Sequence, residues 1–386
     1  MTTQRYSKAN WNQPPHNRHS FQHMSDLFTT AVIKRGTADA SPMETQLTDL
    51  SQIAYPVGGG RTEPLQHFLD STFTDAFLVM QHGVVLTEAY SNNMQADTRH
   101  LLNSVSKSFV GMAAGIAVDH GALEPSQLVS HYLPELSGSA FRDTAVANAL
   151  NMTAAVAYSE DYDSPLDDFW HEAAVVGWRP DLQTEQAPKS LLEYCQRRSQ
   201  TEQQEGEHFH YRTILTNLCA AVVARATGTP FVDFLTQQLW QPLGPENDAN
   251  VVVDATGAPY MGAGMSACAR DLARFGEMLR QDGYYNGKQI VAESWVRQTR
   301  EGTPELKRLF AASDYGPMLP SGHYCNQVWA DPGAGEMLCI GIHGQFIYVN
   351  RPKALVCVKL SSQPAPTDLQ LYATSYRALR GLAAEL

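Results

Sequence analysis

A long apolar segment that opens with a serine and a lysine constrains the fold of this chain more than any other stretch. It runs from Leu101 to Gly121, and Ser104 and Lys107 stand three residues apart near its start. Apolar residues follow at the spacing of one helical face, which predicts a helix that Gly121 ends. These residues are Phe109, Met112, Ala113, Ile116 and Ala117. Because positions i and i+3 share a helical face, the lysine amine can reach the serine hydroxyl.

The start of this helix favours a serine nucleophile whose base is a lysine. A side chain in the first turn meets free backbone N–H groups and the positive end of the helix dipole. That field and burial both favour a neutral Lys107, which is the state that a base needs. The ordinary alternative for Ser104 and Lys107 is an N-cap serine and a surface lysine.

The composition argues against several classes of function. The chain has 386 residues with 28 basic and 40 acidic side chains, a formal charge of −12, and no basic run longer than a pair. We therefore expect no nucleic-acid partner. The N-terminus lacks an apolar signal region, and no stretch approaches the roughly 18 apolar residues of a membrane span. These features predict a soluble, cytoplasmic protein with no membrane partner.

Other motifs for chemistry are weak. The six cysteines are scattered without a C-x-x-C pair, so neither a zinc site nor a disulfide framework is indicated, and we expect no metal or cofactor. Ser266 lies in Gly264-Met-Ser-Ala-Cys268, which lacks the closing glycine of a nucleophile elbow. We therefore interpret Ser266 as a helix cap.

The remaining pattern predicts strands toward both ends of the chain and helices between them. The first 64 residues are interpreted as a wrapping arm with one helix, and a hairpin follows at 76–80 and 84–90. The middle is helical and includes a helix over 213–227. Later elements are an amphipathic helix over 266–280, strands over 337–342, 346–349 and 354–360, and a last helix that Thr367 caps.

This order predicts an α/β (α+β) fold in which both chain ends build one domain. Residues 1–120 and 256–386 are expected to form an antiparallel sheet flanked by helices. Residues 121–255 are expected to form an inserted, mostly helical subdomain. The active site would then lie between the two parts.

Several segments match one family in order along the chain, beginning with its only S-x-x-K, Ser104-Val-Ser-Lys107. The segments are Asn10–Arg18, Asp75–Val79, His100–Ser108, Ser266–Arg274, Gly341–Gln345 and Val358–Ser362. The chain resembles the penicillin-recognising serine hydrolases, namely serine β-lactamases, DD-peptidases and related esterases. Within them it is similar to the 6-aminohexanoate-oligomer (nylon-oligomer) hydrolases and their carboxylesterase relatives. The resemblance implies a β-lactamase/transpeptidase-like fold.

The resemblance also implies two catalytic tyrosines. The family tyrosine that shares a proton network with the lysine falls on Tyr211, and Thr213 stands where the wider family often has an asparagine. A second tyrosine matches Tyr162, which would approach the leaving-group nitrogen when a loop closes. Trp178 and Ala173 are then expected in the substrate pocket. Ala173 stands where family enzymes that act efficiently on amino-acid oligomers can carry an acidic residue.

The third family element, normally K-[ST]-G on an inner strand, matches Cys339-Ile340-Gly341, so its cationic residue is missing. The resemblance implies that the backbone N–H groups of Ile342 and Ser104 form the oxyanion hole. A glycine before the donor lets the strand approach substrate closely. His343 is expected to line the pocket.

Together the matches imply a cofactor-free serine hydrolase that cleaves carboxylic esters, and small linear amides, through an acyl-enzyme. Its partner would be a small-molecule ester or amide, and family analogy suggests a homodimer. A β-lactamase or DD-peptidase is the related alternative, although the missing asparagine and lysine argue against it. A non-catalytic binding protein on the same scaffold is the alternative from another class. Taken singly, Tyr211, Tyr162, Ile342 and His343 also suit ordinary packing positions.

Overall fold

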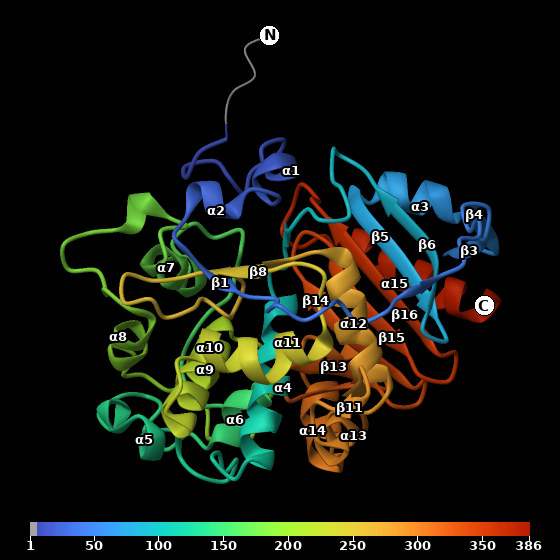
Figure 1. Ribbon diagram of the computed structural model, residues 1–386. Helices are drawn as coiled ribbons and strands as arrows, with labels where there is room; N and C mark the ends of the chain where they lie inside the picture. The colour runs from blue at the N-terminus through green and yellow to red at the C-terminus, as the bar shows by residue number, and fades with distance from the viewer. Residues whose placement is uncertain (1–5) are drawn as a thin grey trace.

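An eight-stranded sheet dominates the computed structural model, which describes residues 6–386 (Figure 1). Its order is β12-β13-β14-β15-β16-β5-β6-β2, so strands from the two ends of the chain meet where β16 pairs with β5. Every pair is antiparallel except β2 with β6. The strands are β2 (Glu44–Thr45), β5 (Thr74–Gln81), β6 (Val84–Tyr90), β12 (His323–Cys325), β13 (Val328–Asp331), β14 (Glu336–Gly341), β15 (Gln345–Asn350) and β16 (Leu355–Ser361).

A four-stranded antiparallel sheet leads into the serine helix. Its order is β1 (Thr30–Ile33), β8 (Ala249–Val252), β9 (Met265–Ala267) and β7 (His100–Leu101). The predicted domain boundary at residue 255 falls between β8 and β9, which pair with each other. Two further pairs are β3 (Ala54–Gly58) with β4 (Arg61–Pro64) and β10 (Tyr284–Tyr285) with β11 (Lys288–Gln289).

Helices cover both faces of the large sheet. Gly276 of α12 (Ala269–Arg280) lies against Val356 of β16, whereas Lys359 of the same strand lies under Phe68 of α3 (Leu65–Ser71). Because side chains alternate along a strand, α12 and α3 lie on opposite faces. Helix α15 (Leu369–Glu385) packs beside α3, and α13 (Glu293–Glu301) and α14 (Pro304–Ala311) pack at the β12–β13 edge.

The helices from the middle of the chain gather around α4 (Val105–Asp119) and α9 (Thr213–Thr227), which pack against each other (Figure 1). Their companions are α5 (Val129–Tyr132), α6 (Val146–Leu150), α7 (Asp168–Val175), α8 (Leu191–Gln196), α10 (Phe231–Leu235), a π-helical turn (Thr236–Trp240) and α11 (Gln241–Leu243). Among residues 6–386, no single helix is long and apolar enough to cross a membrane; α9 and the segment Phe231–Leu243 reach that length and composition only as a pair bent by 82°.

The structure confirms the predicted hairpin at 76–90 and the helices after Ser104 and over 213–227. The interpretation of Ser266 as a helix cap is wrong, because this residue pairs with Leu101 and Asn250 in β9. Thr367 does not cap the last helix either. The carboxylate of Asp368 does so, accepting the backbone N–H groups of Gln370 and Leu371 at 2.9 and 3.0 Å.

The polar first segment contains more structure than one helix. It holds α1 (Asn17–Ser20), α2 (Met24–Leu27) and β1, and buries Trp11, Phe21 and Phe28. The side-chain amide of Asn17 donates to the carbonyls of Ser362 and Gln363 at 3.2 and 2.9 Å. The arm therefore connects the strand end after β16 with the entrance to α4.

Candidate active site

Ser104 stands at the N-cap of α4 with its hydroxyl against a lysine amine. The Nζ atom of Lys107 lies 2.9 Å from Ser104 Oγ, as the i, i+3 spacing predicts. Lys107 is 1% exposed, and Ser104 is 7% exposed. The alternative of a surface lysine is thereby excluded.

Lys107 has two further hydrogen-bond acceptors. Its amine donates to Thr213 Oγ1 at 2.9 Å and to the carbonyl of Gly262 at 2.6 Å. Burial lowers the pKa of Lys107 to about 8, although the carboxylates of Glu160 and Glu172 oppose this change. At pH 7 about a tenth of Lys107 is therefore neutral, which is the state that a general base requires.

Both predicted tyrosines share a cavity with Ser104. The ring of Tyr211 lies 5.0 Å from Lys107 Nζ, and Tyr211 lines the cavity beside Ser104. The hydroxyl of Tyr162 donates to Glu160 at 2.5 Å. Burial and the charge of Glu160 raise the pKa values of both phenols well above 10. Tyr211 and Tyr162 are therefore protonated at neutral pH and can serve as proton donors.

Two backbone N–H groups at the cavity are candidates for the oxyanion hole. Ser104 and Ile342 both line the cavity, and among the described residues neither N–H has a hydrogen-bond acceptor. Gly341 lets the strand end approach α4 closely, since a Cβ there would lie 2.4 Å from the carbonyl oxygen of Leu102. Asn103 Nδ2 donates to the carbonyl of Ile342 at 3.1 Å and holds the turn. This geometry suits the predicted oxyanion role.

The cavity at Ser104 is about 140 Å³ and mostly apolar. Its wall includes Tyr315, Met318, Trp329, Ile340, Phe346 and Tyr372. Asp368 is the only charged side chain among the described residues of that wall. The cavity therefore suits an uncharged acyl group and lacks a cation for a substrate carboxylate.

Three residues predicted for the substrate pocket lie outside this cavity. Ala173 is fully buried in α7, and Trp178 packs its ring 4.5 Å from that of Trp11. His343 Nδ1 donates to the carbonyl of Gln363 at 2.6 Å, and burial lowers the His343 pKa to about 4. The packing of the loops and of the N-terminal arm buries these side chains in the core, and motif matching does not reveal such packing.

Two carboxylates that the sequence reasoning did not single out flank Lys107. Glu160 accepts from Thr213 Oγ1 at 2.7 Å and from the Thr213 N–H at 2.5 Å. Glu172 accepts from Tyr158 and from Asn217, and burial raises its pKa to about 7. The available signal for Glu160 was its place two residues before Tyr162. Among residues 6–386, no group of His, Cys, Asp or Glu is placed to hold a metal ion.

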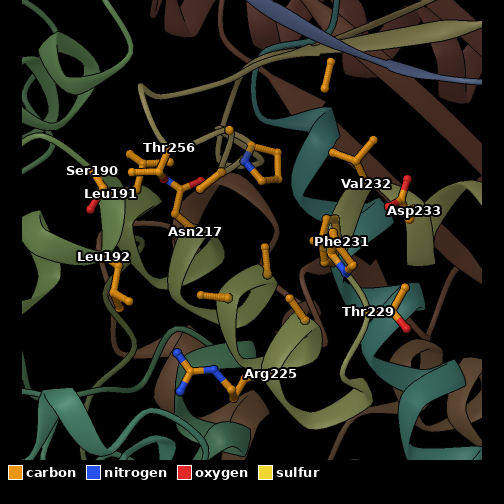
Figure 2. Close-up of a pocket in the computed structure, with 18 of the residues that line it drawn as sticks. Ser190, Leu191, Leu192, Asn217, Arg225, Thr229, Phe231, Val232, Asp233 and Thr256 are labelled. Atoms are coloured by element: carbon orange, nitrogen blue, oxygen red, sulfur yellow. The ribbon is translucent and has the colours of Figure 1, made fainter.

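A larger cavity of about 820 Å³ lies elsewhere, between α8, α9 and α10 (Figure 2). Ser190, Leu191 and Leu192 line one side of it, and Phe231 and Val232 line the other. It does not include Ser104 or either tyrosine. Volume alone therefore does not identify the reactive site.

Comparisons with known proteins agree with this geometry. A family model described as Beta-lactamase matches residues 65–382. The 6-aminohexanoate-dimer hydrolase of Paenarthrobacter ureafaciens is 34% identical over 359 residues, which cover 92% of this chain and 88% of that protein. A Bacillus anthracis structure assigned as a 6-aminohexanoate-dimer hydrolase has a TM-score of 0.87 at 25% identity, covering 98% of this chain and 96% of its own.

Esterase structures share the fold at lower similarity. A family VIII carboxylesterase has a TM-score of 0.58 at 14% identity, covering 82% of this chain and 95% of its own. The β-lactamase-type arrangement of sheet and helices is thus common to all of these proteins. On the family match and the 34% identity, the chain belongs to the β-lactamase family and is a serine hydrolase.

Proposed function

We propose that the protein cleaves carboxylic esters, and small linear amides such as 6-aminohexanoate oligomers, through an acyl-enzyme on Ser104. The observation that carries this proposal is the 2.9 Å contact between Ser104 Oγ and a buried lysine amine whose pKa is lowered to about 8. The phenols and free amides around this contact supply the other groups that acyl transfer needs.

Acylation begins when Ser104 Oγ attacks the substrate carbonyl and its proton passes to neutral Lys107. The new C–O bond places the oxyanion between the N–H groups of Ser104 and Ile342. The proton on Lys107 then reaches the leaving oxygen or nitrogen through Tyr211 as the bond to that atom breaks. If Tyr162 protonates the leaving atom instead, its phenolate takes up the proton that Lys107 holds, so the amine is neutral again. The alcohol or amine leaves, and the acyl group stays on Ser104.

Deacylation uses the same groups in reverse order. Water loses a proton to neutral Lys107 and attacks the acyl carbon, and the oxyanion again lies between the two amides. Collapse of this intermediate breaks the ester bond to Ser104 and returns the proton to its oxygen. The free acid leaves, and Lys107 is neutral again.

The cavity wall favours esters of uncharged acids over β-lactams. A β-lactam or a D-alanyl peptide carries a carboxylate, and the described wall has an aspartate and no arginine, lysine or histidine. The relative from Paenarthrobacter ureafaciens supports the oligomer as a second substrate.

A panel of p-nitrophenyl esters, the 6-aminohexanoate dimer and nitrocefin tests the proposal with wild type and Ser104→Ala. Ester hydrolysis that the substitution abolishes is the expected result. Rapid nitrocefin turnover without ester hydrolysis would overturn it in favour of a β-lactamase. If a fluorophosphonate failed to label Ser104 in the folded protein, a non-catalytic binding role would replace it.

A further inference from the structure

The carboxylate of Glu160 occupies a junction between the lysine and the second tyrosine. One oxygen accepts both the hydroxyl of Thr213, at 2.7 Å, and that of Tyr162, at 2.5 Å. The other oxygen accepts the backbone N–H of Thr213, the first residue of α9, at 2.5 Å. Glu160 thus caps α9 and touches two side chains of the site at once.

These contacts determine which way each proton points around Lys107. The carbonyl of Gly262 can only accept, so it takes one proton of the amine. The hydroxyl proton of Thr213 is committed to Glu160, because an ionised carboxylate can only accept. Thr213 Oγ1 must therefore accept from Lys107 at 2.9 Å, which commits a second proton of the amine.

A neutral amine has two protons and one lone pair. With its protons held by Gly262 and Thr213, the lone pair of Lys107 points toward its remaining contact, Ser104 Oγ at 2.9 Å. If the Thr213 hydroxyl pointed the other way, it would donate to the same lone pair and compete with Ser104. The direction of one hydroxyl proton thus decides whether Lys107 faces the nucleophile as a base.

We propose that Glu160 is a positioning residue, which orients the Thr213 hydroxyl and thereby aims the lone pair of neutral Lys107 at Ser104. This inference rests on the proposed serine hydrolase mechanism. A plain helix cap at α9 would explain the contact with the backbone N–H of Thr213. It would not require the second contact with the Thr213 hydroxyl.

Several groups from different elements lie around Lys107. Ser104 lies on its own helix α4, Glu160 on the loop before α7, Glu172 on α7, and Tyr211 just before α9. Both carboxylates raise the pKa of Lys107, while burial lowers it. Removing the charge of Glu160 should therefore lower the pKa of Lys107 further.

Glu160→Gln removes the charge of the side chain and one of its two acceptor atoms while keeping its shape. The amide must place an NH2 group against Thr213, which turns the hydroxyl toward Lys107 or opposes the backbone N–H. We expect the plateau of kcat/KM for an ester to fall at least about tenfold. We also expect the acidic limb of the pH profile to move to lower pH. Asp163→Asn, which removes an exposed charge from the same loop, should change neither quantity.

A double-mutant cycle with Thr213→Val completes the test. If Glu160 acts through the Thr213 hydroxyl, Glu160→Gln should lower kcat/KM by less than about twofold in the Thr213→Val background. An equal loss in both backgrounds would overturn the inference. If Glu160→Gln does not fold, Glu160→Asp replaces it. We expect the retained charge to keep the acidic limb of the pH profile in place, and the shorter side chain to lower the plateau of kcat/KM. A plateau equal to that of wild type would contradict the inference.

Ser104→Ala tests the nucleophile separately from the positioning role of Glu160. Ser104→Ala must abolish ester hydrolysis if Ser104 is the nucleophile, whatever Glu160 does. An active wild type that depends on Ser104 and is indifferent to Glu160 would remove only the positioning role.

Discussion

Two fully buried lysines in this chain each lie beside a serine, but the surroundings of the two pairs differ. Lys107 donates to Ser104 at the N-terminus of α4, and Lys359 donates to Ser361 within β16. Burial lowers the pKa of Lys107 to about 8 and that of Lys359 to about 7. Judged by titration and by the nearest hydroxyl alone, both pairs would qualify as a nucleophile and its base.

The two serine–lysine pairs differ in their access to a cavity. Lys359 and Ser361 are both 0% exposed, and Phe68 of α3 covers the amine with its ring 5.5 Å away. Ser104 instead opens onto the cavity that Tyr211 and Ile342 also line. A lowered pKa is therefore a weak criterion by itself, and a catalytic serine also needs room for substrate and donors for the oxyanion.

The largest expected difference between the pairs lies in the serines. Ser104→Ala should lower ester kcat/KM at least about ten-thousandfold, because it removes the nucleophile. Ser361→Ala should keep kcat/KM within about threefold and instead lower the free energy of unfolding by about 1–3 kcal/mol, since it leaves the Lys359 amine short of an acceptor. Steady-state kinetics and urea unfolding of both variants measure this. Comparable kinetic losses would erase the distinction.

Substitution of Lys107 should also lower kcat/KM more than substitution of Lys359, by a smaller factor than for the serines. Lys107→Met should lower ester kcat/KM about a thousandfold through loss of the general base. Lys359→Met should retain activity and fold at least as stably at neutral pH, because an apolar side chain replaces a buried amine at little cost. Kinetics on folded protein, checked by circular dichroism, decide the matter. An inactive but folded Lys359→Met would show that the second pair supports catalysis.

The sequence predicts the catalytic pair better than its surroundings, for a physical reason. The i, i+3 spacing of Ser104 and Lys107 is local, so the helix alone brings the two side chains together. Glu160 reaches Thr213 only through the fold of a loop, and no periodicity encodes that contact. Trp178 and His343 do not line the cavity at Ser104, because the N-terminal arm, through Trp11 and Phe21, packs against them.

Local patterns also decide which strands can be predicted from the sequence. Strands with continuous apolar runs, such as β5 and β16, were predictable from their residues. The short strands β7 and β9 were not, because two or three residues carry no period and only pairing defines them. Ser266 illustrates this limit, since a serine before an amphipathic helix is typical of a cap.

The turn at Ile342 offers a third contrast, since Ser104 shares its cavity with Ile342, whereas Ser361 is 0% exposed. Gly341→Ala would place a Cβ 2.4 Å from the Leu102 carbonyl and push the turn away from α4. We expect kcat to fall about a hundredfold with a smaller change in KM, as for loss of one oxyanion donor. Gly138→Ala is the matched control, because a Cβ at Gly138 meets nothing within 4 Å. Equal kcat values for both variants would contradict the assignment of Ile342.

The smallest expected effect is on the pH dependence of the free energy of unfolding, and it differs between the two lysines. A lysine whose pKa is lowered on folding binds its proton more readily in the unfolded chain, so stability rises with pH between the folded pKa and about 10.5. For Lys359 that window opens at about 7, and for Lys107 at about 8. Lys359→Met should therefore gain most over wild type near pH 7, and its advantage should shrink as the pH approaches 10. Urea unfolding across this range measures the difference, with exposed Lys288→Met as the control. A pH-independent difference would mean that Lys359 titrates alike in both states, and the two buried pairs would then differ in electrostatics as well as in access to substrate.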